Sequence, residues 1–195
     1  FIHTSVSATG SHRDFPGWAE GDWDVNYWES KAYTEDLVRG AGFASWTLLR
    51  PAFFMENLIR PSFLFENWEG DRLVTVLQPD TVLALISVKD IGETAAAAIV
   101  DPERFNGVAL ELAVERLPMR EIVRILGAAW SLPLEAPELT PEQAIALGML
   151  PVFVRSQQQM NRFHHPGDPE PARRAGLTLT PFETWARQSA PGRAG

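Results

Sequence analysis

The sequence contains no cysteine and only two lysines, Lys31 and Lys89. Without cysteine the chain can form neither disulfide bonds nor thiolate metal sites. The net charge of −8 and the pI near 5.0 argue against a nucleic-acid partner, because phosphate binding needs clustered Lys and Arg. No apolar run is long enough to span a membrane, and no secretory signal opens the chain. We therefore expect a cytoplasmic protein that binds neither nucleic acid nor membranes.

The chain is long enough, and apolar enough, to bury a core. It has 195 residues, of which 45% are hydrophobic, and apolar strand-like segments alternate with helical ones as far as about Leu132. That alternation predicts an α/β fold with an open parallel sheet and right-handed crossovers. After Leu132 the strands thin out and short helices with Pro and Gly joints follow. We expect a sheet domain over residues 1–131 and a small, mostly helical lobe over 132–195 packed on it.

Individual elements are predicted from caps, breakers and apolar runs. Strands are expected at residues 1–6, 45–50, 72–76, 82–86 and 107–114. A long loop over 7–22 is expected to overhang a site. The first helix is expected to begin after a cap at Asp22 or Asp24, and a second at Phe53 with a break at Pro61. Further helices are expected after Ser87, at residue 119 beside Pro118, and at residue 151. Two capping-box signals, Thr140–Gln143 and Thr180–Glu183, predict two more helix starts.

Tyr27 and Lys31 are four residues apart on the first expected helix, and therefore lie on the same face. A tyrosine pKa of about 10 is too high for base chemistry at neutral pH, but a neighbouring positive charge would lower it. The alternative is an exposed tyrosine over a lysine stem. Ser5 and Ser7 end a strand about twenty residues upstream, at the sheet edge where ligands of such folds bind. We expect Ser, Tyr and Lys to converge on one crevice.

Four segments carry a resemblance to a known family. HTSVSATG, YWESKAYTEDLVRGAGFASWTLLRPAFFMENL, ISVKDIGETAAAAI and FNGVALELAVERLPMREIVRILG resemble the second half of an atypical short-chain dehydrogenase/reductase of the NmrA-like branch. The resemblance covers nearly the whole chain. It implies a partial Rossmann-like sheet, an NAD(P) cofactor with NADP favoured, and hydride transfer between the nicotinamide and a small carbonyl-type substrate. It leaves a homodimer open.

The resemblance also implies roles for individual residues. Lys31 would hold the nicotinamide ribose hydroxyls, and Tyr27 would act as general acid/base with its pKa lowered by Lys31 and bound cofactor. Ser5 would hydrogen-bond the substrate carbonyl, with Ser7 as the competing choice. The expected cofactor-binding residues are Thr4, Ser5, Lys31, Pro51, Ala52 and Phe53, and the expected substrate-binding residues are Trp18, Phe54 and Asn57.

The family's glycine-rich pyrophosphate loop is not recognisable in this sequence. Gly40-Ala41-Gly42 follows an expected helix and precedes an expected strand, which is the reverse of the required order, so it is interpreted as a helix end. The chain begins at Phe1 in what reads as mid-fold. A non-catalytic NAD(P)-sensing regulator of the same family and an inactive fragment are therefore alternatives to an oxidoreductase.

Two further clusters of residues have both a functional and a structural interpretation. His164, His165 and Asp168 could be imagined as metal ligands, but adjacent histidines cannot easily share one ion, so we expect a Pro-Gly loop and no metal site. A group of aromatic residues fits an apolar substrate pocket and an ordinary core equally well. These residues are Phe53, Phe54, Phe63, Phe65 and Trp68.

Overall fold

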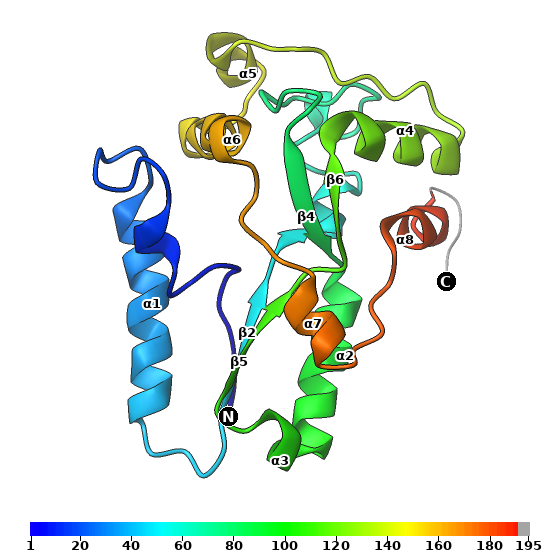
Figure 1. Cartoon of the computed structure of the whole chain (residues 1–195). Coiled ribbons are helices and arrows are strands. Elements are labelled where there is room, and N and C mark those ends of the chain that lie inside the picture. The colour runs from blue at the N-terminus through cyan, green and yellow to red at the C-terminus, as the bar shows by residue number, and fades with distance from the viewer. Residues whose placement is uncertain (191–195) are drawn as a thin grey trace.

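The first of two three-stranded sheets is entirely parallel and lies at the centre of the molecule (Figure 1). The structure is a computed structural model and describes residues 1–190. The strands are β1 (Ile2–Thr4), β2 (Thr47–Pro51) and β5 (Val108–Leu112), in the order β1-β2-β5. Leu49 pairs with Thr4 on one side and with Leu110 on the other. The predicted α/β fold with a Rossmann-like parallel sheet is confirmed.

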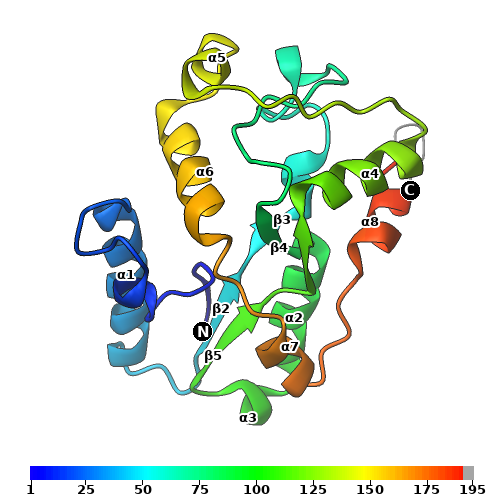
Figure 2. The same ribbon diagram turned by 45° about the horizontal axis from the view of Figure 1, so that its top comes forward.

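Helices cover both faces of this sheet, as Figures 1 and 2 show. Helix α1 (Val25–Gly40) lies on one face, and α2 (Val88–Val100) and the short α3 (Pro102–Phe105) lie on the other. The expected caps are present. The Asp24 carboxylate accepts from the Tyr27 N–H at 3.0 Å, and the Ser87 hydroxyl accepts from the Asp90 N–H at 3.0 Å. Both helices therefore begin where local sequence predicts.

The second sheet was not predicted. It consists of β3 (Phe53–Phe54), β4 (Val82–Ile86) and β6 (Glu115–Pro118), with β3 parallel and β6 antiparallel to β4. The expected helix at Phe53 is wrong, because the backbone there pairs with β4 before two 3₁₀ turns, η2 (Met55–Leu58) and η3 (Glu66–Trp68). The expected strand at 72–76 is also wrong. It makes only isolated bridges, since no strand runs beside it.

Five helices follow β6 in the C-terminal half. They are α4 (Met119–Trp130), α5 (Pro141–Ala146), α6 (Pro151–Phe163), α7 (Glu170–Arg174) and α8 (Phe182–Gln188). The capping box of Thr140 and Gln143 is confirmed, with bonds of 2.8 and 3.3 Å. Thr180 does not cap α8. Its N–H and hydroxyl donate to the buried Asp90 carboxylate at 2.8 and 2.9 Å, because a buried carboxylate needs donors.

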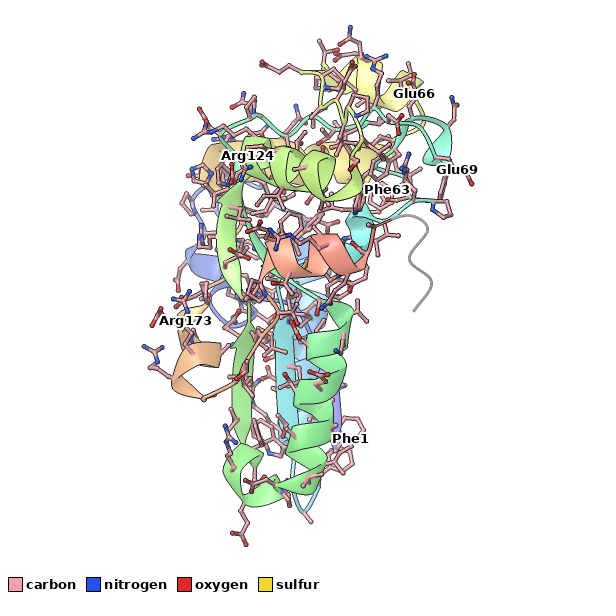
Figure 3. The ribbon with its side chains drawn as sticks, turned by 90° about the vertical axis from the view of Figure 1, so that its right-hand side faces the viewer. Phe1, Phe63, Glu66, Glu69, Arg124 and Arg173 are labelled. Atoms are coloured by element: carbon pink, nitrogen blue, oxygen red, sulfur yellow. The ribbon has the colours of Figure 1, made fainter. Side chains whose placement is uncertain are left out.

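Two hydrophobic clusters hold these layers together. One lies between the second sheet, α4 and α8, and the other between the first sheet and α2. Residues beyond 132 contribute to both, with Phe182 in the first and Ala172 in the second. The boundary at 131/132 stays a prediction. Figure 3 shows Phe1 at one end of the molecule and Phe63, Glu66 and Glu69 at the other. Over residues 1–190, no helix combines the length and apolar character required to cross a bilayer.

Candidate functional site

Tyr27 lies in the first turn of α1, and Lys31 lies beside it as the spacing predicts. The Lys31 ammonium is 5.5 Å from the centroid of the Tyr27 ring. Burial raises the pKa of Tyr27, and the neighbouring Asp24 carboxylate raises it further. Lys31 is not among the causes of this shift, and a lowering of the Tyr27 pKa by Lys31 together with bound cofactor stays a prediction. The ammonium faces the ring, while Asp24 is held close because it caps the helix.

A cavity of about 470 Å³ opens beside Tyr27. It lies beyond the carboxyl ends of β1 and β2, where Val6 and Phe53 follow those strands, and between the start of α1 and α6. Its walls are mostly aromatic and aliphatic, with a few polar groups. The lining residues are Val6, Trp23, Asp24, Tyr27, Trp28, Phe53, Asn57, Phe63, Leu64, Pro151, Val152, Phe153, Arg155, Ser156, Gln157, Gln159, Met160, His165 and Pro166.

Helix α6 is held in place by contacts with two other parts of the chain. On one side, Gln157 accepts from the Thr75 hydroxyl at 3.0 Å and from the Val76 N–H at 2.8 Å. On the other side, Phe163 stacks on Trp23 with ring centroids 5.7 Å apart. Next to that stack, Arg162 pairs with Asp22 at 2.6 Å. The end of the 7–22 loop and α6 therefore hold one wall of the cavity together.

The structure brings some of the predicted site residues to the cavity and leaves others away from it. Tyr27, Phe53 and Asn57 line it, whereas Ser5, Lys31, Trp18 and Phe54 do not. Trp18 packs edge-on against His12, and Phe54 is exposed. Of the remaining predicted cofactor residues, Thr4 is exposed and Pro51 and Ala52 are buried. The roles assigned to these residues stay predictions.

The two candidate serines are hydrogen-bonded within the protein. The Ser7 hydroxyl donates to Glu111 at 2.6 Å, and the Ser5 hydroxyl donates to Thr9 at 3.3 Å. Both serines are buried. They belong to a polar layer between the first sheet and α1, so either hydroxyl would have to exchange a protein partner for a substrate.

The centre of this layer is an ion-pair network. Glu35 accepts from Arg50 at 2.9 and 2.6 Å and from Arg39 at 2.8 Å. Burial raises the pKa of Glu35, but hydrogen bonds from Arg50, Ser5 and Arg39 outweigh it, so the net direction is down. Burial raises the pKa of Glu111, against the opposing effects of Ser7 and Arg50. Every charge here has a partner, which indicates a structural network.

Sequence reasoning missed the polar groups that α6 and the following loop bring to the cavity. His165 lines it, and its Nδ1 accepts from the Gly167 N–H at 3.1 Å. Burial lowers the pKa of His165 to about 4, with the positive charge of Arg116 adding to the effect. Gln159, also on the lining, is buried. The run RSQQQ gives no local signal that one glutamine faces a cavity.

The two neighbouring histidine rings, His164 and His165, are held by different backbone groups. His164 accepts from the Val82 N–H at 3.1 Å, so each of the two rings has a separate backbone partner. In the part of the chain that the structure describes, no three His, Asp or Glu side chains are grouped to hold an ion. The HHPGDPEP segment is instead a loop that leads into α7.

The residues present fit the nicotinamide end of a dinucleotide. A phenol, an asparagine and aromatic walls meet at the carboxyl edge of a parallel sheet, where such ligands bind. Within residues 1–190, no short glycine-rich turn joins a strand of the parallel sheet directly to a helix, which is where such folds hold the pyrophosphate. Gly40 and Gly42 have open space around them, and a Cβ on Gly10 would meet the Arg50 guanidinium at 3.1 Å. These glycines therefore serve a helix end and the ion network.

Three comparisons place the chain among known proteins. The model of the NmrA-like family matches residues 16–166. An uncharacterized oxidoreductase, YesF of Bacillus subtilis (strain 168), is 32% identical over 87 residues, which is 45% of this chain and 30% of that protein. Among solved structures, Citrobacter sp. triphenylmethane reductase complexed with NADP(H) superposes with a TM-score of 0.71 at 13% identity, covering 96% of this chain and 64% of that one.

A regulator shares the fold as well. NmrA, described as a negative transcriptional regulator and solved in complex with NADP, superposes with a TM-score of 0.64 at 16% identity, covering 96% of this chain and 63% of that one. The chain thus spans somewhat less than two thirds of the length of these solved proteins, and the match to YesF spans under a third of that relative.

Proposed function

Because the chain belongs to the NmrA-like family, we propose that it forms the substrate side of an NAD(P)-dependent oxidoreductase acting on a small carbonyl-type compound. The observation that carries the proposal is Tyr27. Its hydroxyl has no partner within residues 1–190, and its side chain lines the aromatic cavity of about 470 Å³. A free phenol beside an apolar pocket is suited to proton transfer with a bound carbonyl.

The raised pKa of Tyr27 favours the reductive direction. The phenol keeps its proton at neutral pH and can donate it to the carbonyl oxygen as that oxygen gains negative charge. A bound nicotinamide would supply the hydride. In this proposal Lys31 holds the ribose hydroxyls, Phe53 positions the nicotinamide ring, and the aromatic walls exclude water from the reacting carbon.

We place NADP ahead of NAD as the cofactor. NmrA was solved with NADP and also with NAD, whereas triphenylmethane reductase was solved with NADP(H). Support for NADP in this chain comes from that likeness alone. Side-by-side calorimetric titration of NADPH and NADH into the chain tests the choice, and tighter binding of NADH would contradict it.

A dinucleotide-sensing regulator is the second candidate, favoured by the likeness to NmrA. A panel of carbonyl compounds, assayed by consumption of NADPH and paired with calorimetry, separates the two functions. The oxidoreductase proposal expects consumption with at least one carbonyl. Tight dinucleotide binding without consumption would favour the regulator. If neither dinucleotide binds or raises the melting temperature of the 195-residue chain, both functions are contradicted for this chain.

A further inference from the structure

Helix α6 carries a buried amide group that has no hydrogen-bond partner. Gln159 is 8% exposed, and its Nε2 finds no acceptor within residues 1–190. Buried polar groups in folded proteins nearly always have a partner, and an unsatisfied one destabilises the fold. Gln159 also lines the cavity beside Tyr27. The Nε2 atom itself is shielded from the cavity, so a ligand can supply the missing acceptor once the carboxamide turns about its terminal bond toward the cavity.

Gln157, two residues earlier on the same helix, anchors α6 to the rest of the protein. The Gln159 amide is therefore not needed for that purpose. Gln157 too is buried, but its carboxamide oxygen accepts from Thr75 and Val76. Two residues along an α-helix turn the side chain by about 200°. Gln157 therefore anchors α6 to the 72–81 segment. Gln159 lies on another face of the helix, the face that it shares with Phe163 four residues further on, and Phe163 stacks on Trp23.

Other polar groups on the cavity lining are also donors. The Tyr27 hydroxyl has no partner within residues 1–190. In His165, Nδ1 accepts a hydrogen bond, so the proton of the neutral ring lies on Nε2, which has no partner in the same range. A ligand that satisfies these groups must bring acceptor atoms. The surrounding rings of Trp23 and Phe53 require it to be largely apolar.

We propose that Gln159 is a specificity-determining residue that donates a hydrogen bond to a second acceptor oxygen of the substrate. This rests on the proposed function, in which Tyr27 serves the reacting carbonyl. The substrate class is then a largely apolar ring compound with one carbonyl to be reduced and a further acceptor oxygen. The aromatic walls hold the ring, and Gln159 selects for the second oxygen.

A matched pair of ligands tests this. 1,4-Diacetylbenzene has a second carbonyl where 4-isopropylacetophenone has an isopropyl group of similar shape. Dissociation constants of both are measured by calorimetry for the 195-residue chain, for Gln159→Leu and for Gln158→Leu. Gln158 lies on the same helix but is exposed, which makes it the control. The preference for the diketone is the ratio of the dissociation constant of 4-isopropylacetophenone to that of 1,4-diacetylbenzene. We expect Gln159→Leu to reduce this ratio about tenfold, and Gln158→Leu to leave it unchanged.

An unchanged preference in Gln159→Leu would overturn the inference, as would the failure of the folded wild-type chain to bind either ligand. The melting temperature of each variant checks that it is folded. Gln159→Leu is expected to keep the wild-type melting temperature, because the substitution removes an unsatisfied polar group. Gln159→Glu, which replaces the donor with a carboxylate, should also lose the preference. The binding measurement is made without dinucleotide, so a Gln159-dependent preference without any turnover would leave the inference intact and contradict the proposed function. Turnover combined with a preference that does not depend on Gln159 would support the proposed function and overturn the inference about Gln159.

Discussion

Two groups of polar side chains lie beside α1, and they differ in how completely their polar atoms are hydrogen-bonded. Between α1 and the first sheet, Glu35, Arg50 and Glu111 bind one another and neighbouring hydroxyls. At the cavity, Tyr27 and Gln159 have donors without partners in residues 1–190. A saturated network stabilises the fold, whereas unsatisfied groups beside a cavity are available to a ligand. The comparison predicts that substitutions in the two regions affect different properties.

The largest effect on stability is expected from Glu35→Ala. The Glu35 side chain is 1% exposed, and its loss leaves the guanidinium of Arg50 without its main partner. We expect the free energy of unfolding to fall by about 3–5 kcal/mol, measured by urea denaturation. Asp36→Asn is the control, because Asp36 is 75% exposed and also pairs with Arg39. Equal midpoints for the two variants would show that the network is not structural.

An intermediate effect is expected from the two buried glutamines of α6. Gln157→Leu leaves Thr75 and the Val76 N–H without their acceptor, so stability should fall by about 1–3 kcal/mol. Gln159→Leu removes a group that has no partner, so stability should be unchanged or slightly higher. Urea midpoints of the two variants measure the difference. If both variants lost the same free energy of unfolding, Gln159 would have a hydrogen-bond partner in solution. The difference proposed between the paired network and the cavity would then be contradicted.

A smaller effect is expected from His165 as pH falls. Its pKa of about 4 in the folded protein lies below the ordinary value of 6.5, so the unfolded chain binds the proton more readily between these values. Stability is therefore fully present above about pH 6.5 and declines toward pH 4. We expect a loss of roughly 1–2 kcal/mol between pH 8 and pH 5 that is missing in His165→Gln. Parallel pH profiles of the two proteins would contradict this.

Local sequence predicted the elements whose signals lie within them. The Asp24 and Ser87 caps, α4 and α6 follow from capping residues and apolar periodicity. The second sheet depends on pairing between segments far apart in the chain. Phe53 and Phe54 form a two-residue strand only because β4 lies beside them, and no local pattern reveals that.

The candidate site was predicted only in part, because some of its residues are brought together by packing between segments far apart in the chain. Tyr27, which its spacing from Lys31 singled out, lies on one side of the cavity. The other side consists of Gln159 and His165, which reach the cavity only because α6 packs against Trp23. Ser5 and Ser7 were expected at the crevice from their place after β1. Instead, the Ser7 hydroxyl donates to the partly buried Glu111, and the Ser5 hydroxyl donates to Thr9.

The most direct test of the account uses the only two tyrosines of the chain, which both lie on α1. Tyr27 lines the cavity, whereas Tyr33, six residues further on, is 65% exposed. NADPH-dependent reduction of 1,4-diacetylbenzene is measured for Tyr27→Phe and Tyr33→Phe. The account predicts that kcat falls by about 10²-fold or more in Tyr27→Phe, with dinucleotide binding retained, and is unchanged in Tyr33→Phe. Equal turnover in both variants would contradict it.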